Sequence, residues 1–159
     1  MQVKDRPALS RSVLHLLHRA GQSADDLFAR ELPESDLTPR QFAVLVALAG
    51  QDTASQTEIV AATGIDRSTL ADIVKRLLQR GLLARRRSKS DARAYAVRLT
   101  PAGEHVLQTA LPAADRVSER MLKLLPAARR TEFLDALSEI VRQLGTGVGT
   151  AALSIRERR

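Results

Sequence analysis

Positive charge is concentrated in one stretch of the 159-residue sequence. Between Asp66 and Arg98 there are ten lysines and arginines against three aspartates, so this segment carries the full formal net charge of +7. The rest of the chain carries 15 basic and 15 acidic side chains. A basic stretch is usually only a solvated surface, but an excess confined to one segment of an otherwise neutral chain is typical of a polyanion-binding surface.

The residue types that catalysis requires form no recognisable group. The absence of cysteine excludes disulfides, thiolate metal sites and thiol-based redox sensing. No paired nucleophile and base is apparent, so we predict neither an enzyme nor a cofactor. His15 and His18 lie one helical turn apart, in a row continued by Gln22 and Asp25 or Asp26. Two histidines on one helix can hold a transition metal, but a plain polar stripe or a role in a ligand pocket explains them better, and we predict no metal site.

Length and composition favour one domain. The chain is 44% hydrophobic, and no apolar run approaches the roughly 18 residues of a membrane span. The first ten residues, MQVKDRPALS, lack the apolar core of a signal peptide. We therefore expect a cytoplasmic protein.

Apolar periodicity and capping signals predict a mainly α-helical chain. Thr38 with Gln41, and Ser55 with Glu58, have the spacing of capping boxes, and Asp66 can cap a further helix. After Gly81 the apolar period changes from 3.6 to 2, which predicts a two-stranded hairpin with a polar tip. Helices are expected over 8–32, 38–50, 55–64, 66–81, 100–125 and from Pro126 to about 144, with the hairpin over 82–100 and a flexible tail over 146–159.

Two short helices followed directly by a hairpin have the order of a winged helix-turn-helix. The stretches LTPRQFAVLVAL, SQTEIVAATGIDRSTLADIVKRLLQRGLLARRRSKSDARAYAVRLTPAG and the Leu-Thr-x-x-Gly pattern at Leu99, Thr100 and Gly103 resemble the multiple antibiotic resistance regulator (MarR) family. The resemblance implies a single domain with a DNA-binding lobe at 37–100 and dimerisation helices at 7–33 and 101–145. It also implies a sequence-specific regulator, which we expect to be a repressor released by a small molecule.

The predicted DNA contacts lie on the helix that follows Ile65 and on the hairpin. Arg93 is expected in the minor groove, where a narrow A·T segment attracts arginine, and Asp91 is expected to fix the turn. Arg67 could contact guanine, and Asp72 would repel phosphate unless it pairs with Lys75 or Arg76 or accepts from a cytosine amino group. The full predicted set is Arg67, Ser68, Thr69, Asp72, Lys75, Arg76, Arg85, Arg87, Lys89, Asp91 and Arg93.

The long terminal helices carry apolar stripes outside the winged lobe, and they need a second surface to cover them. We therefore expect a homodimer on pseudo-palindromic double-stranded DNA, with recognition helices roughly 34 Å apart. The resemblance places an effector, such as an aromatic acid or its thioester, near His15, His18, Arg19, Arg40 and Phe42. The alternative is a ligand-independent architectural or protein-interaction module on the same fold. RNA binding is less attractive because aromatic residues make up 3% of the chain.

Overall fold

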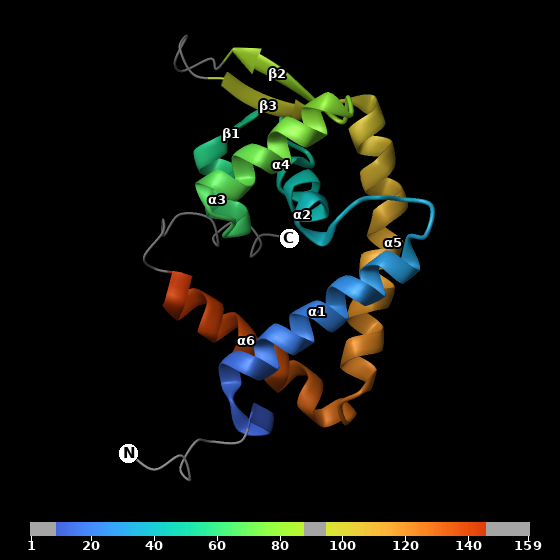
Figure 1. Cartoon of the computed structure of the whole chain (residues 1–159), viewed down its shortest axis with the longest axis vertical. Helices are drawn as coiled ribbons and strands as arrows, with labels where there is room; N and C mark the ends of the chain where they lie inside the picture. The colour runs from blue at the N-terminus through green and yellow to red at the C-terminus, as the bar shows by residue number, and fades with distance from the viewer. Residues whose placement is uncertain (1–8, 88–94, 146–159) are drawn as a thin grey trace.

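A computed structural model describes residues 9–87 and 95–145 of the chain (Figure 1). Within those residues the mainly helical winged fold predicted from the sequence is confirmed. The helices are α1 (Val13–Glu31), α2 (Pro39–Leu48), α3 (Gln56–Thr63), α4 (Arg67–Gln79), α5 (Pro101–Lys123) and α6 (Arg130–Gly145), and the strands are β1 (Ala54–Ser55), β2 (Leu83–Arg87) and β3 (Tyr95–Leu99). None of the described helices combines the length and apolar composition that crossing a membrane requires.

Side-chain caps begin α2 and α3 at the predicted positions. Thr38 Oγ1 accepts a hydrogen bond from the Gln41 N–H at 3.2 Å, and Gln41 Oε1 accepts one from the Thr38 N–H at 3.1 Å. Ser55 and Glu58 form the same reciprocal box at the start of α3. Each such cap stabilises its helix by about 1 kcal/mol. These local signals explain why the helix starts could be predicted from the sequence.

The sheet has three strands, whereas the sequence predicted a two-stranded hairpin. β3 lies in the middle, with β2 along one side and the two-residue β1 along the other, both antiparallel to it. Ala54 pairs with Val97, and Ser55 pairs with Ala96. A strand of two residues is too short to show the alternation by which strands are recognised. Because Ser55 also caps α3, the sheet and the helix-turn-helix share a continuous stretch of backbone.

The core of the lobe holds α4 in place against α2, α3 and the sheet. Leu83 and Leu99 face each other across β2 and β3, and both are buried together with Val97. The largest side chains that are fully buried in the described chain are Leu45, Leu48, Ile59, Leu70, Leu77 and Val44. They come from α2, α3 and α4, so the orientation of α4 is fixed by close packing rather than by its own helix propensity.

The chain passes from the wing into α5 through a close backbone contact. Thr100 caps α5 by accepting from the Gly103 N–H at 3.1 Å, and its hydroxyl donates to the Gly81 carbonyl at 2.7 Å. A Cβ atom placed on Gly103 would lie 2.1 Å from the Leu82 carbonyl oxygen. Leu82 cannot move away freely, since the same oxygen accepts from the Thr100 N–H at 3.1 Å. This contact gives a steric reason for the glycine in the Leu-Thr-x-x-Gly pattern.

Helix α1 crosses α5 and packs against it, and an ion cluster ties the end of α1 to α5 (Figure 1). The Glu31 carboxylate accepts from Arg116 Nε and from Arg120 Nη1, each at 2.6 Å. The Glu31 side chain is 15% exposed, whereas both arginines are more than half exposed. Hydrogen bonds from Arg116 and then from Arg120 hold the pKa of Glu31 below its ordinary value. The cluster therefore favours the charged carboxylate in the folded state.

The lowered pKa predicts a pH-dependent contribution to stability. A carboxyl group whose pKa is lower in the folded than in the unfolded state stabilises the folded protein at pH values above its unfolded pKa of 4.5. This stabilisation is lost as the pH falls through the pKa of the folded state. Glu31→Gln should therefore lower Tm most at neutral pH, and the difference from the parent should shrink below about pH 4.5. Thermal unfolding across this range measures it, with the exposed Glu34→Gln as control. A Tm difference that does not depend on pH would contradict the prediction.

Helix α6 begins at Arg130, four residues after the predicted start at Pro126. Pro126 has an extended ψ of 140° and precedes a 3-10 turn at Ala127–Arg129. Proline is common at the first position of a helix, but it is equally compatible with the residue before a turn. The sequence therefore predicts the last helix correctly but places its start four residues too early.

Helices α1 and α6 expose apolar side chains that the described chain leaves uncovered. Both lie at the end of the molecule away from the wing (Figure 1). Leu14 of α1 and Leu144 of α6 are 78% and 81% exposed, and α6 has no buried residue. The exposed apolar residues of these helices are Val13, Leu14, Leu16, Leu17, Phe133, Leu134, Ile140, Val141 and Leu144. Apolar surface of this extent typically marks an interface.

Candidate nucleic-acid interface

Helix α4 has one buried and one exposed face, as the apolar spacing predicted. Leu70, Ile73, Val74 and Leu77 are buried against the lobe. Of the six side chains predicted to face solvent or DNA, Thr69 is half-buried and the others are exposed, namely Arg67, Ser68, Asp72, Lys75 and Arg76. A helix presented in this way beside a wing can enter the major groove of DNA with its exposed face.

Asp66 caps α4 and organises the first turn of its exposed face. Asp66 Oδ1 accepts from the Ser68 hydroxyl at 2.6 Å and from the Thr69 N–H at 2.9 Å. The Ser68 hydroxyl, and then the Thr69 N–H and hydroxyl, hold the pKa of Asp66 well below its usual range. Asp66 is therefore a carboxylate at neutral pH, and it acts on its neighbours only as an acceptor.

Four charged side chains on this face have no partner within the described chain. Arg67, Lys75 and Arg76 make no hydrogen bond or ion pair with another described residue, and Asp72 makes none with Lys75 or Arg76. Asp72 is therefore not neutralised by Lys75 or Arg76 in the described chain. The three cations are free to bind phosphates or base edges, which are the two kinds of contact that position a DNA-binding helix.

Arg80, which contributes to the basic segment, has a structural role that the sequence did not reveal. Its guanidinium forms an ion pair with Asp36, and Arg80 Nη1 lies 3.5 Å from Gln41 Oε1. The Gln41 side chain is buried and also caps α2. Arg80 thus connects the end of α4 to the loop before α2. No local pattern relates residues 36, 41 and 80, so only the tertiary structure could show this contact.

The wing carries basic side chains on both of its faces. The register places Arg85 on the same face as the buried Leu83 and Arg86 on the opposite face, and both arginines are exposed. Arg98 is half-buried, and its Nε atom is buried without a hydrogen-bond partner among the described residues. Arg87 ends β2. The remaining predicted contacts of the wing lie outside the described residues, namely Lys89, Asp91 and Arg93.

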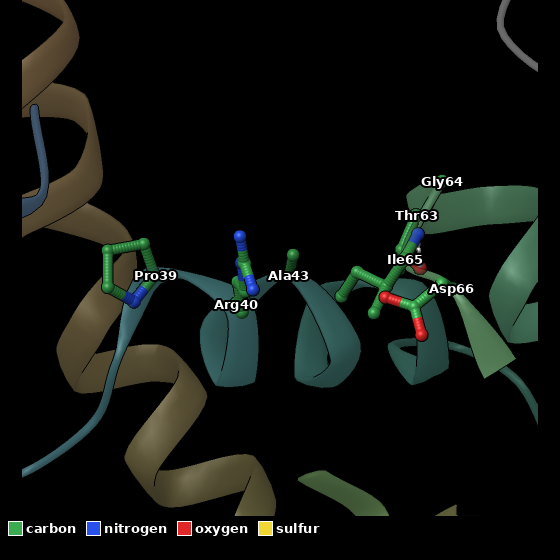
Figure 2. Close-up of a pocket in the computed structure, with 7 residues that line it drawn as sticks. All are labelled: Pro39, Arg40, Ala43, Thr63, Gly64, Ile65 and Asp66. Atoms are coloured by element: carbon green, nitrogen blue, oxygen red, sulfur yellow. Dashed lines mark hydrogen bonds between the residues drawn. The ribbon is translucent and has the colours of Figure 1, made fainter. Parts of the chain in front are cut away.

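Two hollows meet at Arg40, near the start of α2. The larger has a volume of about 380 Å³, and Figure 2 shows Arg40 and Ala43 on α2, with Ala43 between Arg40 and the turn that joins α3 to α4. Its lining residues are Pro39, Arg40, Ala43, Thr63, Gly64, Ile65 and Asp66. The smaller hollow, of about 250 Å³, is lined by Thr38, Arg40, Gln41, Thr69, Asp72, Ile73 and Arg76. Arg40 therefore shares both hollows with residues of α4 or its cap.

The structure separates the side chains predicted to bind an effector. Arg40 is exposed and makes no hydrogen bond or ion pair with another described residue. Phe42 packs on Phe28 with ring centroids 5.4 Å apart, so it supports the core. His15 is half-buried and His18 and Arg19 are exposed on α1, which lines neither of the two hollows. No group of three or more histidine, aspartate or glutamate side chains suited to a metal ion occurs in the described part of the chain.

The lobe, its wing and the exposed basic face of α4 define a winged helix-turn-helix DNA-binding protein. Residues 35–94 match the model of the MarR family. Over 133 residues, 84% of each chain, the protein is 32% identical to the HTH-type transcriptional repressor NicR of Pseudomonas putida. The chain belongs to the MarR family, as its sequence motifs suggested. It is a DNA-binding transcriptional repressor and not an enzyme.

Solved structures agree with this assignment over nearly the whole chain. BpsR of Bordetella bronchiseptica, whose DNA binding is regulated by 6-hydroxynicotinic acid, superposes with a TM-score of 0.78 at 34% identity, covering 85% of this chain and 96% of BpsR. CouR of Rhodococcus jostii RHA1 bound to p-coumaroyl-CoA gives 0.71 at 27% identity, covering 85% and 95%. CouR on a 23-mer DNA duplex gives 0.75 at 32% identity, covering 89% and 98%.

Proposed function

We propose that this repressor acts as a homodimer on a pseudo-palindromic operator and is released by an aromatic carboxylic acid or its thioester. The proposal that a small molecule releases the repressor rests on the Arg40 guanidinium, which has no partner in the described chain and lies where two hollows meet. A cytoplasmic location follows from binding chromosomal DNA. In this proposal residues 37–100 form the DNA-binding lobe, and residues 7–33 and 101–145 form the dimerisation part.

The exposed face of α4 supports the predicted contacts with DNA. Arg67, Lys75 and Arg76 have no competing partner in the described chain, so each can reach a phosphate or a base. Arg85 and Arg87 of β2, together with Lys89, are proposed to contact phosphates, and Arg93 is proposed to enter the minor groove. Ser68, Thr69 and Asp72 are proposed to face the bases.

The uncovered apolar surface of α1 and α6 supports the homodimer. A second copy of the chain would cover this surface on both partners, because a two-fold axis brings the same patch of each copy together. Symmetry would also place two copies of α4 on two half-sites, which accounts for a pseudo-palindromic operator.

Two observations support an aromatic acid or its thioester as the effector, namely the two hollows at Arg40 and the ligands that similar proteins bind. BpsR responds to 6-hydroxynicotinic acid, and CouR binds p-coumaroyl-CoA. A guanidinium without a partner binds a carboxylate through paired hydrogen bonds. The apolar walls of the larger hollow at Pro39, Ala43 and Ile65 would accommodate a ring. His15, His18 and Arg19 remain proposed contacts of a larger ligand.

Release would follow from the position of the hollows next to α4. The smaller hollow is lined by Asp72 and Arg76, which are proposed to contact DNA. A ligand held at Arg40 would occupy space beside these side chains, and it would bind the free repressor better than the DNA-bound form. Linkage then requires DNA to weaken ligand binding by the same factor.

Replacing Arg40 with alanine should raise the effector concentration needed for release about tenfold or more, while operator affinity changes little. The measurement is operator binding by fluorescence anisotropy, titrated with aromatic acids that include 6-hydroxynicotinic acid and with p-coumaroyl-CoA. Arg129→Ala, an exposed arginine of the turn before α6, is the matched control. An Arg40→Ala repressor that an active ligand releases as readily as the parent would rule out the Arg40 site. Failure of every ligand to release the parent would favour the ligand-independent alternative.

A further inference from the structure

The hydroxyl proton of Ser68 is committed to one hydrogen bond within the protein, which determines whether Ser68 can donate or accept toward DNA. Ser68 is the second residue of α4, and its side chain is exposed on the face proposed to enter the major groove. Its Oγ lies 2.6 Å from Asp66 Oδ1. Because a carboxylate cannot donate, the single hydroxyl proton of Ser68 points to Asp66. What Ser68 presents to solvent is therefore the acceptor side of its oxygen.

Asp66 is itself held in the position that imposes this polarity. Its Oδ1 also accepts from the Thr69 N–H at 2.9 Å, which is the helix cap. The Ser68 hydroxyl and the Thr69 N–H thus fix the carboxylate and keep it ionised. The Ser68 proton cannot turn outward without breaking a charge-assisted hydrogen bond, which is roughly twice as strong as a neutral one.

The same carboxylate disfavours a phosphate at this point of the helix. The N-terminus of a helix commonly binds anions through its free N–H groups, but Asp66 already occupies the Thr69 N–H and adds a negative charge. A donor on the DNA is therefore the group that the outward lone pairs of Ser68 can bind. In the major groove the only base donors are the N4 amino group of cytosine and the N6 amino group of adenine.

We propose that Ser68 is a specificity-determining residue that accepts a hydrogen bond from an exocyclic amino group of cytosine or adenine in each operator half-site. The proposal rests on α4 entering the major groove and concerns the polarity of one contact there. It distinguishes Ser68 from Arg67, which can only donate and would select base acceptors.

The test begins with selection of bound duplexes from a random library by the full-length repressor. At each adenine or cytosine of the selected half-site, the base is then replaced by an analogue without the amino group, purine for adenine and 2-pyrimidinone for cytosine. At guanines, 7-deazaguanine removes the N7 acceptor. Anisotropy gives Kd for the parent, Ser68→Ala, Ser68→Thr, which keeps the hydroxyl, and Ser118→Ala, an exposed serine of α5 far along the chain.

At one base pair, loss of the amino group should weaken binding by the parent about five- to tenfold and should leave the affinity of Ser68→Ala unchanged. Ser68→Thr and Ser118→Ala should respond like the parent. The proposal is overturned if every amino deletion weakens binding by Ser68→Ala as much as binding by the parent, or if 7-deazaguanine is the analogue whose effect disappears in Ser68→Ala. It is also overturned if Ser68→Ala weakens binding to all duplexes equally and lowers the salt dependence, because that result indicates a phosphate contact. A parent that enriches no sequence would instead refute sequence-specific binding itself.

Discussion

Alanine at position 103 is expected to lower the free energy of unfolding by about 2 to 3 kcal/mol, which is typical of strain in a well-packed site. The new Cβ would lie 2.1 Å from the Leu82 carbonyl oxygen. To relieve this contact, the start of α5 must move away from the end of α4, which breaks the hydrogen bonds of Thr100 with Gly81 and Leu82. Urea unfolding followed by circular dichroism measures the effect.

The control for the Gly103 prediction is Gly21→Ala in the middle of α1, where no atom lies within 4 Å of the added Cβ. Alanine favours an α-helix over glycine by about 1 kcal/mol, so this variant should be more stable than the parent. Opposite signs for the two substitutions would show that the contact with Leu82, and not glycine content, determines the result. Equal stabilisation by both would mean that the turn into α5 relaxes freely.

Two glutamates on α6, introduced as Ile140→Glu with Leu144→Glu, should convert the proposed dimer to a monomer. The two positions lie one turn apart on an apolar stripe with Phe133 and Leu137, and a dimer would bury charges there without partners. Operator affinity should fall by roughly 100-fold or more, because the two half-sites would no longer be bound as one unit. Analytical ultracentrifugation gives the oligomeric state and anisotropy gives the affinity.

A matched variant makes the same change of two charge units on the polar side of the helix, as Thr131→Glu with Arg142→Gln. Both of these positions are exposed polar residues, so this variant should remain a dimer and bind the operator like the parent. If the Ile140 and Leu144 variant sediments as a dimer, the apolar stripe of α6 is not the dimer surface.

The helices of the lobe could be predicted because their signals are local. Thr38, Ser55 and Asp66 each bond to a residue three positions later, and this spacing is visible in the sequence. The exposed face of α4 could be predicted for the same reason, since its apolar residues recur with the helical period. The change of apolar period after Gly81 predicted the wing that follows these helices, and the family motif agreed with that order.

Contacts between distant segments could not be predicted. Arg80 pairs with Asp36 across 44 residues, and Glu31 pairs with Arg116 across 85. β1 exists because Ala54 and Ser55 meet β3, and two residues leave no pattern of their own. The hollows at Arg40 likewise depend on how α2 packs beside the turn before α4. Each of these features is set by tertiary packing of side chains that have no relation in the sequence.

The division of α4 into a buried and an exposed face affects how repressors of this fold can evolve specificity for new operators. Arg67, Asp72, Lys75 and Arg76 contribute nothing to the core, and exposed substitutions of this kind usually change stability by less than about 0.5 kcal/mol. After gene duplication, a copy can therefore change its DNA preference one residue at a time while remaining folded. Asp66 is different, because one mutation there removes the helix cap and also frees the Ser68 proton. Divergence at residues 66 and 68 is therefore expected to be correlated, whereas the other exposed positions of α4 can drift independently.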